Sequence, residues 1–250
     1  MTFKVQTPKG EYKYKFVIIN GGEKFLDKEK MKENLLLFDQ IAKRNGLQYG
    51  MVYGTLLGAI REHDFIAHDE DVDLFVLSEN RDTFKSMLFE LRDNGFEVAR
   101  WDRRDGLCSI IRNGEYMDIY FFEPLIPGFR ATLGDPLPER YVTDLKPYEF
   151  QGIEILAAKD AEEAMLEHYG PNWRTPIQTN VNFSKNKLQL LRNRFQWWVY
   201  YNLPDFIFYP WIEKRARHKI EKYNYRAERL NKYLGREVLS MLPLDCYKAR

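Results

Sequence analysis

The sequence predicts an α+β fold that is followed by a helical, aromatic-rich extension. Apolar side chains recur at helical spacing in residues 28–45, whereas residues 72–77, VDLFVL, form the short apolar run of a buried strand. Residues 195–212 contain nine aromatic side chains. A chain of 250 residues, 44% of them hydrophobic, is typical of one well-buried globular domain with appended elements.

Helices and strands are expected to alternate through the first half of the chain. Residues 47–53 have the pattern of a strand, and Thr55 is placed to cap the short helix that follows. Asp82 is placed to cap another helix. Strands are expected around 107–112 and 115–122, because the Asn-Gly pair between them favours a type I′ hairpin turn.

The second half of the chain is expected to begin with a loop. Residues 123–150 contain five prolines and are predicted to form a long ordered loop over a site. A helix is expected to start at Asp160, where Asp-Ala-Glu-Glu has the spacing of a capping box. Helices at 185–202 and 211–234, broken by two prolines, complete the prediction.

Charge divides the chain into two parts. Residues 1–184 carry 23 lysines and arginines against 31 aspartates and glutamates, a net charge of −8. Residues 185–250 carry 15 against 6, a net charge of +9. We therefore predict one α+β domain at 1–184 and a basic helical extension at 185–250, whose charge favours an anionic surface as its partner.

The aromatic residues of the extension favour contact with a membrane surface. Polar residues and prolines interrupt residues 195–212, which argues against a spanning helix. Trp and Tyr beside basic residues are typical of a membrane interface, so residues 195–232 are expected to contact an anionic membrane surface. Two alternatives stay open, an aromatic flap packed on the core and a dimer interface. Basic and aromatic residues also bind single-stranded nucleic acid, but no other feature supports a nucleic-acid partner.

Cysteine and histidine usage argues against two kinds of site. Cys108 and Cys246 fit no CxxC spacing and the four histidines are scattered, so neither a structural zinc site nor a disulfide framework is expected. Residues 1–16 lack the apolar stretch of a secretory signal. The expected location is the reducing cytoplasm, with peripheral attachment to the inner face of the membrane as the variant that the aromatic segment suggests.

Two carboxylates on one strand mark the candidate site. Asp71 and Asp73 are expected to point to the same face, because side chains alternate along a strand, while Val72 points into the core. Such carboxylates repel one another unless a cation lies between them. Hard oxygen ligands suit Mg²⁺ or Mn²⁺, so the pair is a candidate metal site. By itself the pattern is a weak signal, because most Asp pairs are solvated loop or cap residues.

A third carboxylate, Asp118, lies in the apolar strand predicted at 115–122. A lone Asp inside a buried strand is costly unless it is paired or binds a metal. Asp118 is predicted either to complete a one- or two-metal site with Asp71 and Asp73 or to act as a base toward an acceptor hydroxyl.

Gly54, Thr55 and Arg61 are the candidate phosphate-binding residues. Glycine permits close backbone approach, and the start of the helix presents free N–H groups to a phosphate. Arg61 lies about two turns further along and is placed to neutralise another phosphate oxygen. An ordinary buried helix also explains GTLLGAIR alone. Gly-Thr at a helix start, DxD on a strand and then a strand-borne Asp have, in this order, the pattern of the nucleotidyltransferase superfold.

These ordered motifs resemble those of the LicD family. Residues 54–74, GTLLGAIREHDFIAHDEDVDL, are similar to the family signature GTLLGAxRHxGFIPWDDDIDI. Residues 116–122 resemble the family's IDIF strand, residues 150–155 its FEG strand, and residues 169–176, YGPNWRTP, its closing motif. The resemblance extends over residues 30–180.

The resemblance implies a nucleotidyltransferase-like fold with a mixed β-sheet flanked by helices. It implies a divalent metal, Mg²⁺ or Mn²⁺, held by Asp71, Asp73 and Asp118. The implied reaction is attack by a hydroxyl of a glycan, or of its lipid-linked precursor, on the distal phosphorus of a CDP-linked alcohol such as CDP-choline, with release of CMP. Eukaryotic relatives of the family include fukutin-related protein, a ribitol-phosphate transferase.

The loop before the carboxylates departs from the family pattern. Asp64, Ala67 and His68 stand where the family has Gly, Pro and Trp, which affects the expected substrate more than the expected metal. Glu70 keeps the negative charge of its position. The role of Asp69 stays open between support for the metal ligands and pairing with Arg61.

Two other functions compete with phospho-alcohol transfer. A nucleotidyltransferase would move NMP to a small hydroxyl acceptor and release pyrophosphate instead of CMP. An inactive, membrane-associated scaffold of the same fold would bind no divalent metal. The scaffold is the weaker alternative, because a scaffold gains nothing from clustered buried carboxylates.

Overall fold

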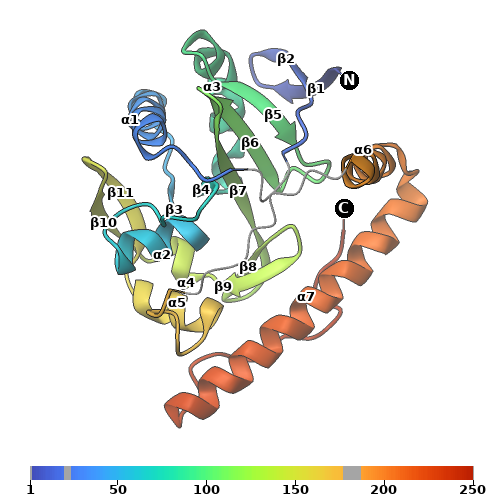
Figure 1. The fold of residues 1–250 in the computed structure, drawn as a ribbon. Coiled ribbons are helices and arrows are strands. Elements are labelled where there is room, and N and C mark those ends of the chain that lie inside the picture. The colour runs from blue at the N-terminus through green and yellow to red at the C-terminus, as the bar shows by residue number, and fades with distance from the viewer. Residues whose placement is uncertain (1, 20–23, 177–186, 250) are drawn as a thin grey trace.

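The computed structural model describes residues 2–19, 24–176 and 187–249, and their core is a mixed β-sheet (Figure 1). Neighbouring strands along the main path of the sheet are, in order, β10 (Leu145–Phe150), β11 (Ile153–Ala158), β3 (Gly50–Met51), β4 (Asp71–Leu77), β7 (Glu115–Ile126), β6 (Leu107–Arg112) and β5 (Glu97–Trp101). The β4–β7 and β11–β3 pairs are parallel and the other pairs on this path are antiparallel. The predicted α+β fold with a mixed sheet is therefore confirmed.

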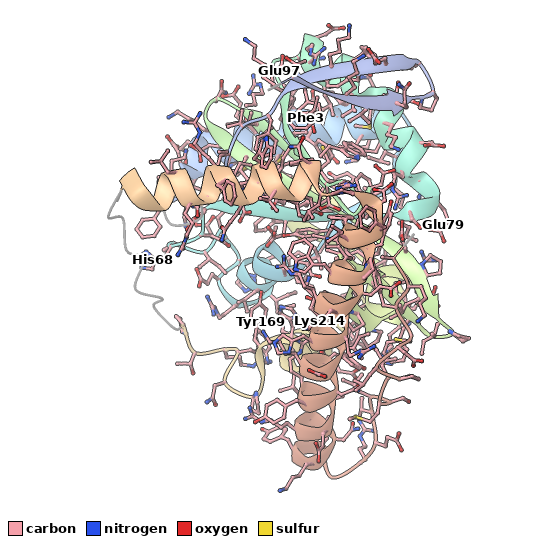
Figure 2. The ribbon with its side chains drawn as sticks, turned by 90° about the vertical axis from the view of Figure 1, so that its right-hand side faces the viewer. Phe3, His68, Glu79, Glu97, Tyr169 and Lys214 are labelled. Atoms are coloured by element: carbon pink, nitrogen blue, oxygen red, sulfur yellow. The ribbon has the colours of Figure 1, made fainter. Side chains whose placement is uncertain are left out.

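Two long helices form the C-terminal part. α6 (Lys187–Asn202) crosses the sheet, and α7 (Asp205–Leu234) runs away from its end along the side of the molecule (Figures 1 and 2). The break before Pro204 is confirmed, but the break predicted at Pro210 is wrong, because this proline lies inside α7. In the second turn, a proline removes one main-chain hydrogen bond, and the packing of the helix offsets that loss.

α7 is packed against the body of the protein along its whole length. Its buried side chains recur every three or four residues: Phe208, Ile212, Ala216, Ile220, Tyr223, Ala227 and Leu230. Arg226 forms an ion pair of 3.1 Å with the buried Glu167 of α5 (Ala161–Tyr169). An unpaired charge at Glu167 would be costly in this position, so the pair fixes the helix to the domain. The predicted domain boundary after residue 184 lies outside the described residues.

The aromatic segment is divided between the core and the surface. Tyr201 donates a hydrogen bond of 2.7 Å to the carbonyl of Trp101, and Phe208 is fully buried. Phe195, Trp198 and Phe206 are exposed. Packing on the core, one of the two alternatives, therefore accounts for the inward-facing rings, and membrane contact stays a prediction for the outward-facing ones.

No helix in the described part of the chain combines the length and the apolar character that crossing a membrane requires.

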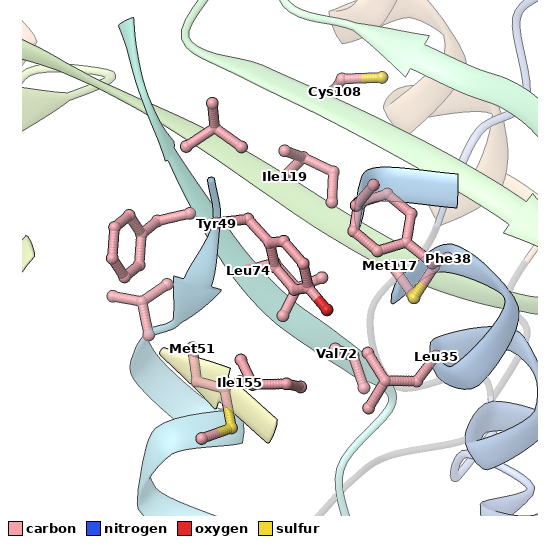
Figure 3. Close-up of a cluster of buried hydrophobic side chains, with 14 of the residues drawn as sticks. Leu35, Phe38, Tyr49, Met51, Val72, Leu74, Cys108, Met117, Ile119 and Ile155 are labelled. Atoms are coloured by element: carbon pink, nitrogen blue, oxygen red, sulfur yellow. The ribbon is translucent and has the colours of Figure 1, made fainter. Parts of the chain in front are cut away.

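One face of the sheet forms the hydrophobic core (Figure 3). Leu74, Ile119 and Cys108 are partners across β4, β7 and β6, and all three are fully buried. α1 (Lys28–Arg44) covers this face with Leu35 and Phe38, and α3 (Arg81–Asp93) packs beside it. The opposite face is consequently the one on which the strand carboxylates lie.

Two short hairpins extend the core. β1 (Thr2–Thr7) and β2 (Gly10–Lys15) form a separate antiparallel pair that the sequence analysis did not predict. In the predicted hairpin, Asn113 and Gly114 have φ values of 55° and 80°, as a type I′ turn requires.

The prediction of a long loop at residues 123–150 is wrong. This stretch contains the end of β7, β8 (Phe129–Thr132), β9 (Asp135–Pro138), the short helix α4 (Arg140–Thr143) and β10. Its prolines lie where a sheet tolerates them: Pro136 and Pro138 on the edge strand β9, and Pro124 at an irregularity of β7. Proline was therefore a poor guide here, because an edge position needs no N–H donor.

Two predicted helix starts are also wrong. α2 (Tyr53–Arg61) begins before Thr55, which lies inside the helix and does not cap it. α3 begins at Arg81, so Asp82 is in its first turn and Asn80 occupies the cap position. The remaining short element is the 3₁₀ turn η1 (Ser78–Asn80).

The packing of α7 predicts that alanine substitutions at two glycines of neighbouring turns destabilise the protein to different extents. Gly134 and Gly128 both have positive φ, but a Cβ at Gly134 would lie 2.7 Å from the Cβ of Ala216 on α7, whereas a Cβ at Gly128 would meet nothing within 4 Å. Gly134→Ala is expected to lower the free energy of unfolding by about 1–3 kcal/mol more than Gly128→Ala, because it overpacks this contact. Urea denaturation of both variants measures the difference, and equal losses would contradict the observed docking of α7.

Candidate active site

Four polar side chains form one row across the sheet. Asp73 of β4 is the partner of Asp118 on β7, Asp118 that of Ser109 on β6, and Ser109 that of Arg100 on β5. Arg100 donates to Asp118 Oδ2 at 2.8 Å and, through Nε, to the Ser109 hydroxyl at 2.7 Å. The Ser109 hydroxyl in turn donates to Asp118. The third predicted carboxylate is thus beside the DxD pair, and it carries its own cation and hydrogen-bond donor.

The start of α2 is fixed to the DxD strand. The backbone N–H of Gly54 donates to Asp73 Oδ2 at 2.9 Å, and the backbone N–H of Asp73 donates to the Thr55 hydroxyl at 2.7 Å. A Cβ at Gly54 would lie 2.8 Å from Asp69 Oδ2 and 3.1 Å from Asp73 Oδ2. A larger residue here would therefore displace at least the Asp69 carboxylate. The predicted binding of a phosphate by Gly54 and Thr55 stays a proposal.

Tyr53, which the sequence analysis did not single out, connects the start of α2 to the site. Its φ of 48° is unusual for a residue with a bulky side chain, and such strain is concentrated at functional sites. Its ring meets Tyr120 edge-on at 5.1 Å and lies 5.0 Å from His168. Tyr120 in turn lies close enough to Asp73 and Asp118 to lower the pKa of both carboxylates. No sequence pattern indicates the positive φ, because only the surrounding packing holds it.

Burial and mutual repulsion dominate the electrostatics of the site. Burial, and then the negative charges of Asp73, Asp118 and Asp69, raise the pKa of Asp71 far above its usual value. Burial, followed by Asp118 and Asp69, does the same to the pKa of Asp73. Burial also raises the pKa of Asp118, although Arg100 opposes it. The charges of Asp69 and Asp118 thus raise the pKa of both Asp71 and Asp73, and Arg100 opposes the rise at Asp71 and Asp118.

This donor set fits a divalent cation in its chemistry. Carboxylate oxygens are the ligands that Mg²⁺ and Mn²⁺ prefer, and a cation would relieve the repulsion between Asp71 and Asp73. As placed, no three Asp, Glu, His or Cys side chains of the described residues form a metal-binding group. The physical reason is visible at Asp118, which is turned toward Arg100 and Ser109, and at Asp73, which is turned toward Gly54.

Arg61 connects α2 to the closing motif. Its guanidinium donates to the carbonyl of Trp173 at 3.3 Å and pairs with Glu62. Trp173 is buried and so anchors this segment. Tyr169, at the end of α5, is close enough to Asp73, Asp69 and Arg61 for their charges to affect its pKa. The structure therefore brings Gly54, Thr55 and the three aspartates together, whereas Arg61 lies at the far end of α2, beside the closing motif. Binding of a phosphate by Arg61 stays a proposal.

The loop that departs from the LicD pattern is anchored through Asp64. This carboxylate pairs with Lys28 of α1 at 2.5 Å and accepts from Gln151 of the β10–β11 turn at 2.7 Å. His68 is exposed, and its ring lies 4.9 Å from that of Phe25. The extra acid thus holds the loop in place and is not a member of the carboxylate cluster.

Arg100 and Ser109 are the members of the site that the sequence analysis missed. Ser109 had one usable signal, since it is a polar residue at an inward position of the predicted strand 107–112. Arg100 had none, because its position opposite Asp118 depends on the pairing of β5 with β6.

Comparison with known proteins found a similarity to one protein family. Residues 46–160 match the model of the LicD/FKTN/FKRP nucleotidyltransferase domain. Uncharacterized proteins of Rickettsia typhi and Rickettsia prowazekii are 26% and 27% identical to this chain over 139 and 142 residues. Each alignment covers 54% of this chain and 43% or 51% of the relative, so the chain spans about half the length of these relatives.

Several solved nucleotidyltransferases have a similar arrangement. The lincosamide antibiotic adenylyltransferase LnuA superposes with a TM-score of 0.40 and 11% identity, over 64% of this chain and 94% of that protein. ANT(2″)-Ia with adenylyl-2″-tobramycin superposes with a TM-score of 0.42 and 15% identity, over 78% and 99%.

Residues 46–160 are therefore similar to the LicD-family nucleotidyltransferase domain. The domain includes all six residues that the sequence analysis proposed for the site. This similarity supports a role of the phosphotransferase or nucleotidyltransferase type.

Charge repulsion in the site predicts an unusual stability effect. Without divalent cations, Asp71→Asn is expected to raise the melting temperature, because it removes one of several buried like charges. Mn²⁺ at about 100 times its Kd is expected to stabilise the unsubstituted protein by about 2.7 kcal/mol and to leave Asp71→Asn nearly unchanged. Thermal denaturation in EDTA and in Mn²⁺ measures both effects.

The matched control for this prediction is Asp93→Asn, at the exposed end of α3. It makes the same chemical change outside the cluster and is expected to keep the response to Mn²⁺. A protein that Mn²⁺ does not stabilise would contradict the metal site.

Proposed function

We propose that this protein transfers a phospho-alcohol group, phosphocholine or a similar group, from a CDP-linked donor to a hydroxyl of a glycan or of its lipid-linked precursor. The observation that carries the proposal is the placement of Asp71, Asp73 and Asp118 on adjacent parallel strands of a LicD-family domain. In the reaction, the acceptor oxygen forms a bond to the distal phosphorus, the bond from that phosphorus to the CMP oxygen breaks, and CMP leaves.

The surroundings of the three carboxylates favour different roles for them. Among the hydrogen bonds between described residues, none goes to the carboxylate of Asp71, so its charge is the least compensated. Asp71 and Asp73 are therefore the proposed ligands of Mg²⁺ or Mn²⁺, which when bound supplies positive charge to the phosphates. Asp118, whose position Arg100 and Ser109 fix, is proposed to take the proton of the acceptor hydroxyl and to contribute to the metal site.

Gly54, Thr55 and Arg61 are proposed to act on the donor side. Gly54 and Thr55 hold the start of α2 against β4, so a phosphate that approaches Asp73 also meets the N-terminus of this helix. Arg61 lies at the other end of α2, beside the closing motif, where its charge would stabilise the donor.

The outward face of α6 supports the expected membrane partner. Leu191, Phe195 and Trp198 are exposed at the spacing of one helical face, and Arg192 and Arg194 are exposed beside them. Such a face suits an anionic membrane surface, where lipid-linked acceptors are found. The contact through residues 195–232 is part of this proposal, and so is a peripheral location on the inner face of the membrane.

The reaction test is to incubate the protein with Mn²⁺, a panel of CDP-linked alcohols and CTP, and to quantify CMP and pyrophosphate by chromatography. CMP is expected from one of the CDP-alcohols. Asp71→Asn and Asp73→Asn are each expected to lower the rate by several orders of magnitude while the fold stays intact, because both remove a proposed metal ligand. Asp93→Asn serves as the matched control with an unchanged rate.

Other outcomes of this test discriminate between the competing functions. Pyrophosphate from CTP would instead identify a nucleotidyltransferase that moves NMP to a hydroxyl acceptor. No product, together with no binding of Mn²⁺, would identify a scaffold. Full activity in both Asp variants would contradict the assigned metal site.

A further inference from the structure

A cavity lies between the sheet and the C-terminal helices, beside the candidate active site. Its volume is about 730 Å³, within the range of sites for small molecules. Residues at the end of β5, in α6 and in the first half of α7 line it. The residues that determine its chemistry are four cations, Arg100, Arg104, Arg215 and Lys219, and three aromatic residues, Trp197, Tyr200 and Trp211.

The charges on the walls of this cavity do not cancel. Asp102 is the one carboxylate that lines it, and it pairs with Arg104 at 3.2 Å. Neither Arg215 nor Lys219 forms an ion pair with a carboxylate of the described residues. Lys219 is half-buried and donates to the carbonyl of Leu133 at 3.2 Å. Burial lowers the pKa of Lys219, and the charges of Arg104 and Arg215 add to this effect, although Asp135 and Asp102 oppose it. Cations held together in this way favour an anionic ligand.

The aromatic rings give the cavity flat apolar walls. The guanidinium of Arg215 lies 4.9 Å from the ring centre of Trp211, and that of Arg100 lies 5.8 Å from the ring centre of Trp197. These contacts hold the rings and the cations in a fixed relation, so that one ligand meets both. A ligand with a ring of C–H groups and an attached anion, such as a phosphorylated sugar, matches this combination.

Arg100 joins this cavity to the carboxylate row. It lines the cavity, and the same guanidinium donates to Asp118, the proposed proton acceptor, at 2.8 Å. A ligand bound between Arg100 and α7 therefore lies at the Arg100 end of the row, on the far side of Asp118 from Asp73. The start of α2, proposed for the donor, lies at the Asp73 end. Donor and cavity thus flank the carboxylates from two sides, as two substrates of one transfer require.

We propose that this cavity binds the acceptor, and that the acceptor is a phosphate-bearing sugar whose phosphate is held by Arg215 and Lys219 and whose ring packs on Trp197 and Trp211. The assignment of this ligand as the acceptor rests on the proposed transfer reaction. The binding of a sugar phosphate to the cavity can be measured without any transfer. Its consequence is that the C-terminal helices, which lie outside the matched domain, select the substrate.

The test is direct binding by calorimetry in EDTA, with glucose 1-phosphate, glucose, inorganic phosphate and CMP as probes. Glucose 1-phosphate is expected to bind at least about tenfold more tightly than glucose and than inorganic phosphate, because only it meets both the cations and the rings. Arg215→Gln and Lys219→Gln are each expected to weaken it about tenfold or more. Lys219→Arg keeps the charge and is expected to retain most of the binding.

Arg236→Gln is the matched control, since Arg236 is exposed, follows α7 and does not line the cavity. It is expected to bind glucose 1-phosphate with unchanged affinity, and its circular dichroism and that of the cavity variants are expected to match the unsubstituted protein. Equal affinity for glucose and glucose 1-phosphate, or an affinity that neither cavity variant changes, would overturn the proposal. So would tight binding of CMP that Arg215→Gln and Lys219→Gln abolish, because the cavity would then be a nucleotide site.

The outcome is separate from that of the transfer reaction. Asp71→Asn is expected to bind glucose 1-phosphate as the unsubstituted protein does, although it does not turn over the donor. Binding without release of CMP from any CDP-alcohol would support the cavity and contradict the proposed transfer. Release of CMP without binding of glucose 1-phosphate would contradict the cavity and leave the transfer supported.

Discussion

Repulsion between buried carboxylates on one face of the sheet is the constraint on which the rest of the site depends. Asp71, Asp73 and Asp118 lie on adjacent parallel strands, and burial together with the negative charge of Asp118 raises the pKa of Asp71 and of Asp73. Each available compensation comes from a different element: a backbone N–H from α2, a hydroxyl from β6 and a guanidinium from β5. The opposite face buries apolar side chains such as Leu74 and Ile119, and this burial offsets the free-energy cost of the buried carboxylates.

The same constraint explains why the start of α2 is built as it is. Gly54 is needed because a side chain there would collide with Asp69 and Asp73, and the Thr55 hydroxyl ties the helix to the backbone of β4. Tyr53 takes a left-handed conformation at this junction and packs on Tyr120. The start of α2, which resembles a phosphate-binding turn, therefore also positions the carboxylates. Both roles are compatible with phosphoryl transfer.

The C-terminal helices pack on the domain and do not form a separate basic extension. α7 is packed along its length, and the Glu167–Arg226 pair and the Gly134–Ala216 contact fix it to the domain. Its excess of positive charge is partly directed inward, at the cavity that contains Arg215 and Lys219. The outward rings, among them Phe195 and Trp198, are left for a surface partner. Inward and outward faces thus serve different ligands in the proposed function.

Much of the fold was predictable from local patterns. Three elements, α1, β4 and the β6–β7 hairpin, were predicted correctly. Their patterns are the helical period of residues 28–45, the apolar run at 72–77 and the Asn113-Gly114 turn, and each depends only on the local backbone conformation. Residues 123–150 were misjudged because the tolerance of a proline depends on whether its strand is at an edge, which is a property of the whole sheet. The β1–β2 hairpin was missed, since its register is set by packing on β5 as well as by its own residues.

The sequence by itself indicated the family resemblance and the three strand carboxylates, because ordered motifs and a period of two are local properties of the chain. Only the tertiary structure decided that Arg100 and Ser109 belong to the site and that α6 and α7 close a charged cavity beside it. The physical reason is that these contacts join residues far apart in the chain. Strand pairing and helix docking set them, and no local pattern records either.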